Sequence, residues 1–446
     1  MSLVPFLGHR DRSAAVAWRG ARPLSVAEFL TEVAAVARAL PDRRFLVNLC
    51  GDRCRFAVGL AAALLREQVS LLPPTHAREM LRALKQRYAG LYALSDGGAK
   101  TDILETIEYP ESAAGSPEIG MPVFAASQQA AIAFTSGSTG EPAPHPKSWG
   151  RLALGALGEA QCLGLAGAGS VVVVGTVPPQ HMYGLESTVL LALRNDLALH
   201  AARPFYPADI RAALEQIPDE RVLVTTPVHL RALLAEESSL PPLRLILCAT
   251  APLARDMAAE AEARYRAPLH EIYGFTEAGM VATRRTTLEQ RWHTLPGVRL
   301  WRDDQGIRVG GGHVEGEVGL TDVVELEDEH TFLLHGRSAD LVNIAGKRSS
   351  LGYLNQQLMS IEGVEDGVFF MPDGTPEATA RLMVFVVAPR LPREALMSAL
   401  RGRIDPAFLP RPLYYVDRLP RNATGKLSRE ELSRLAEAAA ARGPQA

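Results

Sequence analysis

The sequence predicts an α/β protein: a large N-terminal domain of layered α/β sheets with a β-rich subdomain, then a small, mobile α+β C-terminal domain. Short apolar runs alternate with helical patterns up to about residue 273, which is typical of parallel sheets covered by helices. From about residue 299 the chain is rich in Gly, Asp and Val with alternating polarity, which indicates antiparallel hairpins. At 446 residues, the chain is long enough for two or three domains with substantial cores.

The N-terminal part contains two series of alternating helices and strands. In the helix expected over 27–40, Phe29, Leu30, Val33 and Val36 recur at helical spacing. The first series has expected helices at 27–40, 56–68 and 76–88 and expected strands at 45–49, 69–72 and 91–94. A loop over 108–120 leads to the second series, with strands at 170–177, 222–225, 243–248 and 270–273 and helices at 149–163, 207–216, 228–236 and 254–265.

The sequence pattern changes in the C-terminal part. We expect hairpins over 299–334, a strand at 381–388, a helix at 393–401, a strand at 413–416 and a final helix at 428–442. We place the domain boundary near Ser338–Asp340, which gives a large domain over 1–338 and a small one over 339–446.

Composition excludes several classes of function. With 47% hydrophobic and 22% charged residues, the chain resembles a soluble globular protein. A net charge of -3 and 6% aromatic residues give no footprint of nucleic-acid binding. We find neither a signal peptide nor a run of about 20 apolar residues, so we expect a cytoplasmic protein without a membrane span. The cysteines are expected to be reduced thiols rather than zinc ligands; they are Cys50, Cys54, Cys162 and Cys248.

One glycine-rich stretch, 134–142, organises the rest of the chain. It places hydroxyl side chains and two glycines between an apolar run and Lys147. Glycine permits close approach of the backbone to a ligand, and successive N–H groups in such a turn form a concavity that binds anions. The stretch therefore predicts a phosphate-binding loop, with an ordinary polar surface turn as the alternative.

Further polar stretches follow this loop along the sequence in a fixed order. Pro178–Gly184 follows one expected strand, Ala249–Leu253 follows another, and Tyr273–Glu277 comes about 20 residues later. Each stretch alone is a weak signal, but the ordered set is highly specific. The remaining members are Thr321-Asp322, then Gly336 to Asp340, then Asn343, Gly346 and Arg348, and finally Leu419 to Leu427.

Together these stretches resemble the adenylate-forming superfamily of acyl-CoA and aryl-CoA synthetases, nonribosomal peptide adenylation domains and firefly luciferase. The resemblance runs from about residue 125 to 430. It implies a two-step reaction that requires ATP and Mg²⁺. A carboxylate attacks the α-phosphorus of ATP, giving an acyl-AMP and pyrophosphate, and a thiol then takes the acyl group. It also implies that the small domain turns between the two steps.

The resemblance assigns catalytic roles to four residues. Lys426 is expected to contact the substrate carboxylate and the α-phosphate, where a cation stabilises the developing charge. Glu277 is expected to hold Mg²⁺, which prefers oxygen ligands beside phosphates. Thr276 is expected to hydrogen-bond the α-phosphate, and His181 to stand where the family carries an aromatic gate near the acyl site. Read alone, such residues are more often ordinary surface groups; the ordered set favours the catalytic interpretation.

Other residues are expected around the nucleotide, the thiol and the hinge. Tyr273 is expected to lie along the adenine, Asp322 to accept from both ribose hydroxyls and Arg337 to donate to the ribose. Ala339 and Asp340 are expected to form the hinge. The expected ATP/AMP-binding set also includes Thr135, Ser136, Gly137, Ser138, Thr139, Gly140, Lys147, Thr250, Ala251, Pro252, Gly274 and Arg348, and the thiol tunnel includes Gly346.

The acyl pocket is expected to be mostly apolar. Members that activate amino acids carry an aspartate near His181 that pairs the α-ammonium, and the run over 181–185 has none. A buried ammonium without a carboxylate partner is costly, so we expect an acid without an α-amino group, with an aryl acid such as a hydroxybenzoate favoured. The residues expected to line the pocket are His181, Met182, Tyr183, Gly184 and Cys248.

Two departures from the family pattern stand out. The usual loop lysine comes about two residues after the Thr-Gly, whereas Lys147 comes seven residues after Gly140, beyond three prolines. This Pro-x-Pro-His-x-Lys-x-Trp run is similar to that of stand-alone ligases of bacterial aryl-polyene and xanthomonadin-type pigment pathways, which load hydroxybenzoate-like acids onto an acyl carrier protein. At the hinge, Ala339 stands where many members have a second aspartate.

Three hypotheses for function remain open. The favoured acceptor is the phosphopantetheine thiol of an acyl carrier protein, and the alternative is free coenzyme A. A third hypothesis is a non-catalytic nucleotide-binding homologue. Arginines of the small domain suit docking of an acidic carrier protein or form an ordinary solvated face; they are Arg393, Arg401, Arg403, Arg411, Arg418 and Arg421.

Overall fold

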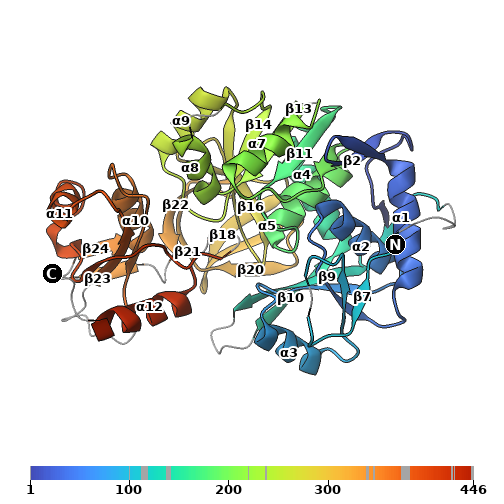
Figure 1. The fold of residues 1–446 in the computed structure, drawn as a ribbon, viewed down its shortest axis with the longest axis horizontal. Helices are drawn as coiled ribbons and strands as arrows, with labels where there is room; N and C mark the ends of the chain where they lie inside the picture. Colours follow the sequence, from blue (N-terminus) through green and yellow to red (C-terminus); the bar gives the residue numbers. More distant parts are fainter. Residues whose placement is uncertain are drawn as a thin grey trace.

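The computed structural model describes residues 2–99, 101–111, 119–136, 142–218, 220–236, 239–337, 341–344, 347–372, 382–422, 425 and 427–442. Figure 1 shows two layered α/β regions, running from the N-terminus through the middle of the chain, and a smaller C-terminal region beside them. This is the α/β class that the sequence predicts. The expected domain boundary at 338/339 lies outside the described residues and stays a prediction.

The first region is a six-stranded sheet with the strand order β10-β9-β5-β4-β6-β7. All its neighbours pair in parallel except the edge pair of β9 and β10, which is antiparallel. The strands are β4 (Phe45–Asn48), β5 (Val69–Leu72), β6 (Tyr92–Ser95), β7 (Thr106–Glu108), β9 (Gln129–Ser136) and β10 (Pro142–Ser148), and the helices are α1 (Val26–Ala39), α2 (Arg53–Leu65) and α3 (Arg78–Arg87).

The second region is an eleven-stranded sheet whose centre is parallel and whose strand pairs at both ends are antiparallel. Its order is β21-β22-β17-β16-β15-β14-β13-β11-β12-β2-β3. The strands are β2 (Ala15–Arg19), β3 (Arg22–Ser25), β11 (Val171–Gly175), β12 (Ala198–His200), β13 (Glu220–Thr225), β14 (Leu245–Cys248), β15 (Leu269–Phe275), β16 (Gly279–Arg284), β17 (Trp292–Thr294), β21 (Asp322–Leu326) and β22 (Thr331–Arg337).

Helices between these strands supply the rest of the core. Helix α2 contacts β4 and β5 of the first sheet and β12 of the second, so it lies between the two sheets. It is rich in alanine and almost wholly buried, because it packs against both sheets. The other helices of this region are α4 (Trp149–Cys162), α5 (Met182–Gly184), the π-helix η1 (Leu185–Leu190), α6 (Leu191–Arg194), α7 (Pro207–Glu215), α8 (Pro227–Ala235) and α9 (Arg255–Tyr265).

Smaller sheets complete the chain. The predicted hairpins after residue 298 include a three-stranded sheet of β18 (Val298–Asp303), β19 (Gly306–Gly311) and β20 (Glu317–Leu320), and β1 (Leu3–Pro5) pairs with β8 (Val123–Ala125). The C-terminal region has its own apolar cluster, which includes Leu354, Val384 and Leu396. Its elements are β23 (Leu341–Ile344), β24 (Lys347–Ser350), α10 (Leu351–Met359), β25 (Asp366–Phe370), β26 (Met383–Val387), α11 (Arg393–Arg401), the short η3 (Pro406–Phe408), β27 (Leu413–Tyr415) and α12 (Arg429–Arg442). Across the described residues, no helix combines the length and apolar character needed to cross a membrane.

Strand β10 is one of the strands that the sequence patterns miss. Proline lacks the N–H that a sheet requires, so a Pro-rich run argues against a strand. Here Pro142, Pro144 and Pro146 alternate with other residues on the edge strand of the sheet. Backbone N–H groups alternate in direction along a strand, so all three prolines place their nitrogens on one side, and edge strands tolerate this on the free side. The run therefore forms an edge strand instead of a stiff loop.

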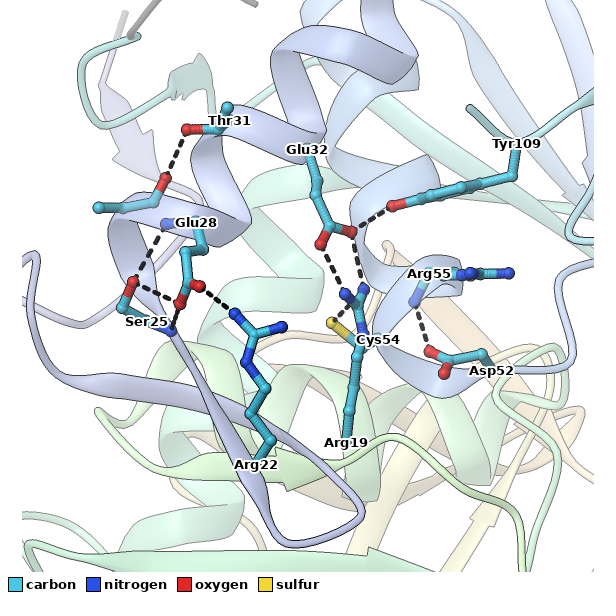
Figure 2. A network of polar contacts seen from close by, with 11 residues as sticks. Arg19, Arg22, Ser25, Glu28, Thr31, Glu32, Asp52, Cys54, Arg55 and Tyr109 are labelled. Carbon is cyan, nitrogen blue, oxygen red and sulfur yellow. Dashed lines mark hydrogen bonds and ion pairs between the residues drawn. The ribbon is translucent and has the colours of Figure 1, made fainter. Parts of the chain in front are cut away.

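Figure 2 shows how α1 is fixed at the N-terminal end of the molecule. Ser25 caps the helix: its Oγ accepts from the backbone N–H of Glu28 at 3.2 Å, and the Glu28 side chain accepts from the Ser25 N–H at 2.8 Å. Further along the helix, Arg19 donates both guanidinium nitrogens to the Glu32 carboxylate at 2.6 and 2.7 Å, and Tyr109 Oη donates to it at 2.6 Å. Glu32 thus joins α1, β2 and the segment after β7.

Replacing Glu32 with alanine is expected to destabilise the protein by about 2–3 kcal/mol. The Glu32 side chain is 17% exposed, so its removal leaves Arg19 and Tyr109 with poorly solvated donors. Glu28→Ala, in the same helix, is the matched control and should cost about 1 kcal/mol, because the Glu28 side chain is more exposed. The midpoint of urea unfolding measures both, and equal losses would contradict the role given to Glu32.

Candidate functional site

The predicted polar stretches gather at one edge of the large sheet. Strands β11, β14 and β15 are parallel members of this sheet, so their carboxyl ends lie at the same edge. Segment 178–184 follows β11, segment 249–252 follows β14, and Thr276 and Glu277 follow β15. In open α/β sheets, ligands bind outside the carboxyl ends of the strands. The structure thus places these sequence-predicted residues where that rule expects a ligand.

The loop after β14 has an unusual backbone. Thr250 adopts a φ of +84°, in the left-handed region that residues with a Cβ rarely enter. Ala251 and Pro252 follow it at the surface edge of the site. Such a conformation costs free energy and is often retained where a backbone group must face a ligand. This observation supports the placement of segment 250–252 in the site.

Two residues predicted to bind the nucleoside contact each other. Tyr273, buried on β15, donates its hydroxyl to Asp322 Oδ2 at 2.5 Å across a separation of 49 residues. Asp322 begins β21, and its backbone is paired in register with that of Arg337 at the end of β22. The Tyr273 ring packs against Trp292 and Phe332, each with ring centroids 5.7 Å away. A flat aromatic side chain and a carboxylate are therefore held side by side.

The tight turn between β15 and β16 carries Thr276 and Glu277. Gly274 precedes it, and a Cβ there would lie 2.4 Å from the carbonyl oxygen of Gly279, so only glycine fits. The Glu277 side chain is 33% exposed and points its Oε1 to within 3.7 Å of His145 Nε2. The same His145 nitrogen lies 2.9 Å from Thr135 Oγ1, the hydroxyl at the base of the predicted phosphate loop. His145 thus bridges the loop and the turn.

Lys147 lies on the same face of β10 as His145, because alternate residues of a strand share a face. The register pairs Pro142 with Ser136 and Lys147 with Ala131, so Lys147 lies about 17 Å along the strand from the loop. Its side chain is 4% exposed, and Nζ donates to the backbone carbonyl of Glu277 at 2.7 Å. Burial lowers the pKa of Lys147, while Glu186, Glu315 and Glu277 oppose that shift.

Glu186 and Glu315 lie near this lysine, and Glu159 lies near Glu186. Glu186, on the π-helix η1, is 5% exposed, and burial raises its pKa to about 7, with Lys147 opposing the shift. Glu159 of α4 is also buried, and burial raises its pKa to about 8. The Glu315 carboxylate accepts from the Ser148 N–H at 2.7 Å and from the Ser148 hydroxyl at 2.5 Å. We did not predict His145, Glu186 or Glu315 as site residues from the sequence. For His145, the alternating prolines were the sequence signal that could have identified it.

The residues predicted for the acyl pocket do not gather in one cluster: Met182 and Tyr183 pack in one apolar cluster, and Cys248 packs in another. His181 caps α5, with its Nδ1 accepting from the Tyr183 N–H at 3.3 Å. Tyr183 Oη lies 3.1 Å from the carbonyl oxygens of Thr225 and Leu247, at the ends of β13 and β14. Burial raises the pKa of the Cys248 thiol well above its usual range. Met182 is buried, and Gly184 packs so closely on Pro178 that a Cβ would lie 1.9 Å from its carbonyl oxygen.

The structure describes only some of the site residues predicted in the C-terminal region. Gly425, with a φ of +78°, packs against Val228 and Thr226 at the start of α8. Arg421 donates to the Gly425 carbonyl at 2.8 Å and to both oxygens of Asp366 at 2.8 and 2.7 Å. It is thus engaged within the domain and does not belong to an exposed docking face. The predicted residues Gly137, Ser138, Thr139, Gly140, Ala339, Asp340, Gly346 and Lys426 lie outside the described residues, and only the backbone is described for Ser136, Arg337 and Arg348.

Glu277 is the carboxylate of this site whose surroundings suit Mg²⁺. Within the described residues, no group of three or more His, Cys, Asp or Glu side chains is arranged to hold a metal ion. A magnesium ion beside a nucleotide usually keeps several waters and takes one or two carboxylates together with phosphates. The single, partly exposed Glu277 carboxylate fits that mode and does not fit a cage made by protein alone.

Comparisons with known proteins agree with the superfamily that the sequence resembles. The family described as AMP-binding enzyme matches residues 44–318. The chain is 29% identical over 275 residues to a 4-coumarate–CoA ligase of Rhodobacter capsulatus, covering 62% of this chain and 67% of that protein. It is 23% identical over 332 residues to a 2-succinylbenzoate–CoA ligase of Staphylococcus epidermidis, covering 68% of this chain and 69% of the relative.

Solved structures share the fold over nearly the whole chain. The o-succinylbenzoate CoA synthetase of Bacillus subtilis, in complex with its acyl-adenylate intermediate, superposes with a TM-score of 0.82 at 18% identity, covering 97% of this chain and 98% of that one. The ATP-bound MatB of Rhodopseudomonas palustris gives 0.80 at 20% identity and 96% coverage of both chains. Both confirm the predicted fold class, with a large N-terminal and a smaller C-terminal domain.

Proposed function

This chain belongs to the AMP-binding enzyme family, and from that premise we propose that it activates a carboxylic acid with ATP and passes the acyl group to a thiol. In the first step a carboxylate oxygen attacks the α-phosphorus, and the bond to the β-phosphate breaks, so pyrophosphate leaves with the electron pair. In the second step a thiolate attacks the acyl carbon, AMP leaves, and the thiol proton passes to solvent. One observation carries the proposal. Tyr273 donates a hydrogen bond to Asp322, and close by His145 links Thr135 to Glu277.

The chain's own residues bind and orient the nucleotide in this proposal. Tyr273 lies along the adenine, and Asp322 accepts from the ribose hydroxyls. Thr135 faces the β- and γ-phosphates, and Thr276 donates to the α-phosphate. Glu277 would hold Mg²⁺, which supplies charge neutralisation for the triphosphate. Adenylyl transfer relies on positioning and charge stabilisation, which suits a site without a protein nucleophile.

The acid is proposed to be an aryl acid without an α-amino group. The carboxylate next to the pocket in sequence is Glu186, which is buried and has its charged form favoured by Lys147, and in this proposal it does not pair a substrate ammonium. The named relatives act on 4-coumarate and 2-succinylbenzoate, which are acids with an aromatic ring. A hydroxybenzoate remains the favoured substrate.

Exchange of labelled pyrophosphate into ATP tests the first step. A panel of benzoates, cinnamates, fatty acids and amino acids is offered in turn with Mg²⁺. We expect exchange with aryl acids, hydroxybenzoates foremost, and none with amino acids. Absence of acid-dependent exchange across the panel would favour the non-catalytic homologue, and exchange with amino acids would contradict the pocket assignment.

For the second step we propose a carrier protein as acceptor, with coenzyme A as the alternative. The relatives named above are CoA ligases, which favours the alternative. The small domain offers exposed arginines that suit an acidic carrier protein; they are Arg393, Arg401, Arg403, Arg411 and Arg418.

We expect holo carrier protein to be acylated at least tenfold faster than coenzyme A at equal, sub-saturating concentration. Electrostatic steering raises association rates and falls with ionic strength, so raising the salt concentration should narrow the difference. Mass spectrometry of the carrier and chromatography of acyl-CoA measure the two products. Apo carrier protein, which lacks the thiol, is the matched control. Robust turnover with coenzyme A and none with the carrier would select the alternative.

A further inference from the structure

We propose that the two basic residues on the inner face of β10 are positioning residues with separate tasks. His145 orients the hydroxyl of Thr135 toward the triphosphate, and Lys147 anchors the Glu277 turn instead of contacting phosphate. The inference rests on the proposed use of ATP. Beyond the use of ATP, the proposal names the residues that replace the usual loop lysine. That lysine comes about two residues after the Thr-Gly, where this chain has Pro142 and Ala143.

The position of His145 follows from the strand. The alternation of Pro142, Pro144 and Pro146 keeps β10 at the free edge and directs the intervening residues to the other face. His145 is therefore presented to Thr135 on the neighbouring strand and to Glu277 on the turn after β15. Its side chain is 22% exposed, so it lies at the rim of the site and not in the core.

The proton on His145 is assigned from its neighbours. Nε2 lies 2.9 Å from Thr135 Oγ1 and 3.7 Å from Glu277 Oε1. A carboxylate oxygen accepts only, and a hydroxyl oxygen both accepts and donates, so an Nε2–H suits both neighbours. When Nε2–H donates to Oγ1, the Thr135 hydroxyl proton is free to donate to an anion. His145 thereby sets the direction in which Thr135 points its donor.

Lys147 is held by a different set of groups. Its Nζ donates to the Glu277 backbone carbonyl at 2.7 Å, and the buried Glu186 carboxylate opposes the loss of its charge. Withdrawing the ammonium would leave Glu186 buried without its counter-charge, which is costly. Lys147 is thus committed to the interior, where it fixes the backbone of the residue proposed to hold Mg²⁺.

The His145 assignment is tested by a double-mutant cycle read out as ATP binding, without acid or thiol. Isothermal titration calorimetry with MgATP measures wild type, His145→Ala, Thr135→Val and the double variant. We expect each single variant to weaken binding about tenfold, and the double variant to match Thr135→Val within about twofold, because His145 acts through Thr135. His293→Ala, at an exposed histidine of β17, is the matched control and should bind as wild type does.

Multiplicative losses in the double variant, near a hundredfold, would overturn the assignment, as would unchanged binding in His145→Ala. A wild-type protein that does not bind ATP would instead refute the proposed function. The two failures are therefore distinguishable.

The Lys147 assignment is tested by comparing ATP binding with Mg²⁺ and with EDTA. If Lys147 acts through Glu277, Lys147→Met should weaken MgATP binding about tenfold and leave metal-free ATP binding within twofold of wild type. Loss of affinity in both conditions would show direct contact with phosphate and overturn the assignment, as would no loss in either.

A second variant guards against misfolding. Lys147→Met/Glu186→Leu removes the buried pair together, and replacing such a pair with apolar side chains is often tolerated. Its binding should show the same dependence on Mg²⁺. Binding of MgATP as tight as that of wild type in this variant would refute the anchoring role.

Discussion

Replacing Arg53 with methionine is expected to destabilise the protein by about 3–5 kcal/mol. Arg53 begins α2 and is fully buried between the two sheets. One guanidinium nitrogen donates to the carbonyl oxygens of His200 and Ala202 at 3.0 and 2.7 Å, and another donates to those of Gly175 and Val177 at 2.7 and 2.9 Å. Methionine fills the space but leaves these carbonyl groups without donors, and each unsatisfied buried group carries a desolvation penalty.

The pKa of Arg53 supports this expectation. Burial lowers it to about 10, so the side chain is still charged at neutral pH and its bonds are charge-assisted. Because the folded pKa lies below the unfolded one, charging Arg53 in the interior costs stability that the hydrogen bonds must outweigh. Between the folded pKa of about 10 and the higher unfolded pKa, the unfolded state binds more protons, so the stability of wild type rises with pH and the gap between wild type and Arg53→Met should widen above a pH of about 10.

Two further variants isolate the effect. Arg53→Lys keeps the charge, but one ammonium cannot reproduce the planar fork that serves several carbonyl groups, so we expect an intermediate loss of about 2 kcal/mol. Arg55→Met, two residues along the same helix, removes a cation–π contact with Tyr109 at 5.1 Å and should cost about 1 kcal/mol or less. Urea unfolding followed by tryptophan fluorescence measures all three. A loss in Arg53→Met no larger than in Arg55→Met would contradict the expectation.

Residues that follow regular strands were the most predictable from sequence. Apolar runs such as 170–177 and 243–248 have the length and β-branched content of buried parallel strands, and the structure has β11 and β14 there. Segments that follow such strands reach one edge of a parallel sheet, so the proximity of residues 181, 250 and 276 followed from topology. The comparisons confirm the superfamily and the fold class, whereas the roles of the individual residues remain predictions.

The environment of Lys147 was not predictable in the same way. Sequence spacing showed only that the lysine was displaced, since a distance along the chain says nothing about the partner strand. The β9–β10 register directs Lys147 to Glu277, and the π-helix brings Glu186 to it from 39 positions further on. Such contacts depend on how two sheets and a helix pack together. Local pattern carries no information about that packing.

Replacing Lys426 with alanine is expected to slow adenylation by about 10²- to 10³-fold, while thioester formation from supplied acyl-AMP changes by less than about threefold. The neighbouring Gly425 packs against the start of α8, directly after β13, at the edge of the sheet where the other site residues lie. A cation placed there stabilises the charge that develops at the α-phosphorus. Pyrophosphate exchange measures the first step, and acyl transfer from synthetic acyl-AMP measures the second.

Substitutions at Arg421 and Arg418 test whether adenylation depends on how Lys426 is held as well as on its charge. Arg421 holds the Gly425 carbonyl and the Asp366 carboxylate, so Arg421→Ala keeps Lys426 but loosens its loop, and we expect adenylation to slow about tenfold. Arg418→Ala, at an exposed residue of the same segment, should leave adenylation unchanged. If the small domain turns between the steps, Lys426 leaves the site before the thiol arrives, and only the first step depends on it. Equal loss of both half-reactions in Lys426→Ala would show that the lysine stays in place, and would rule out such a turn as the way this protein separates its two reactions.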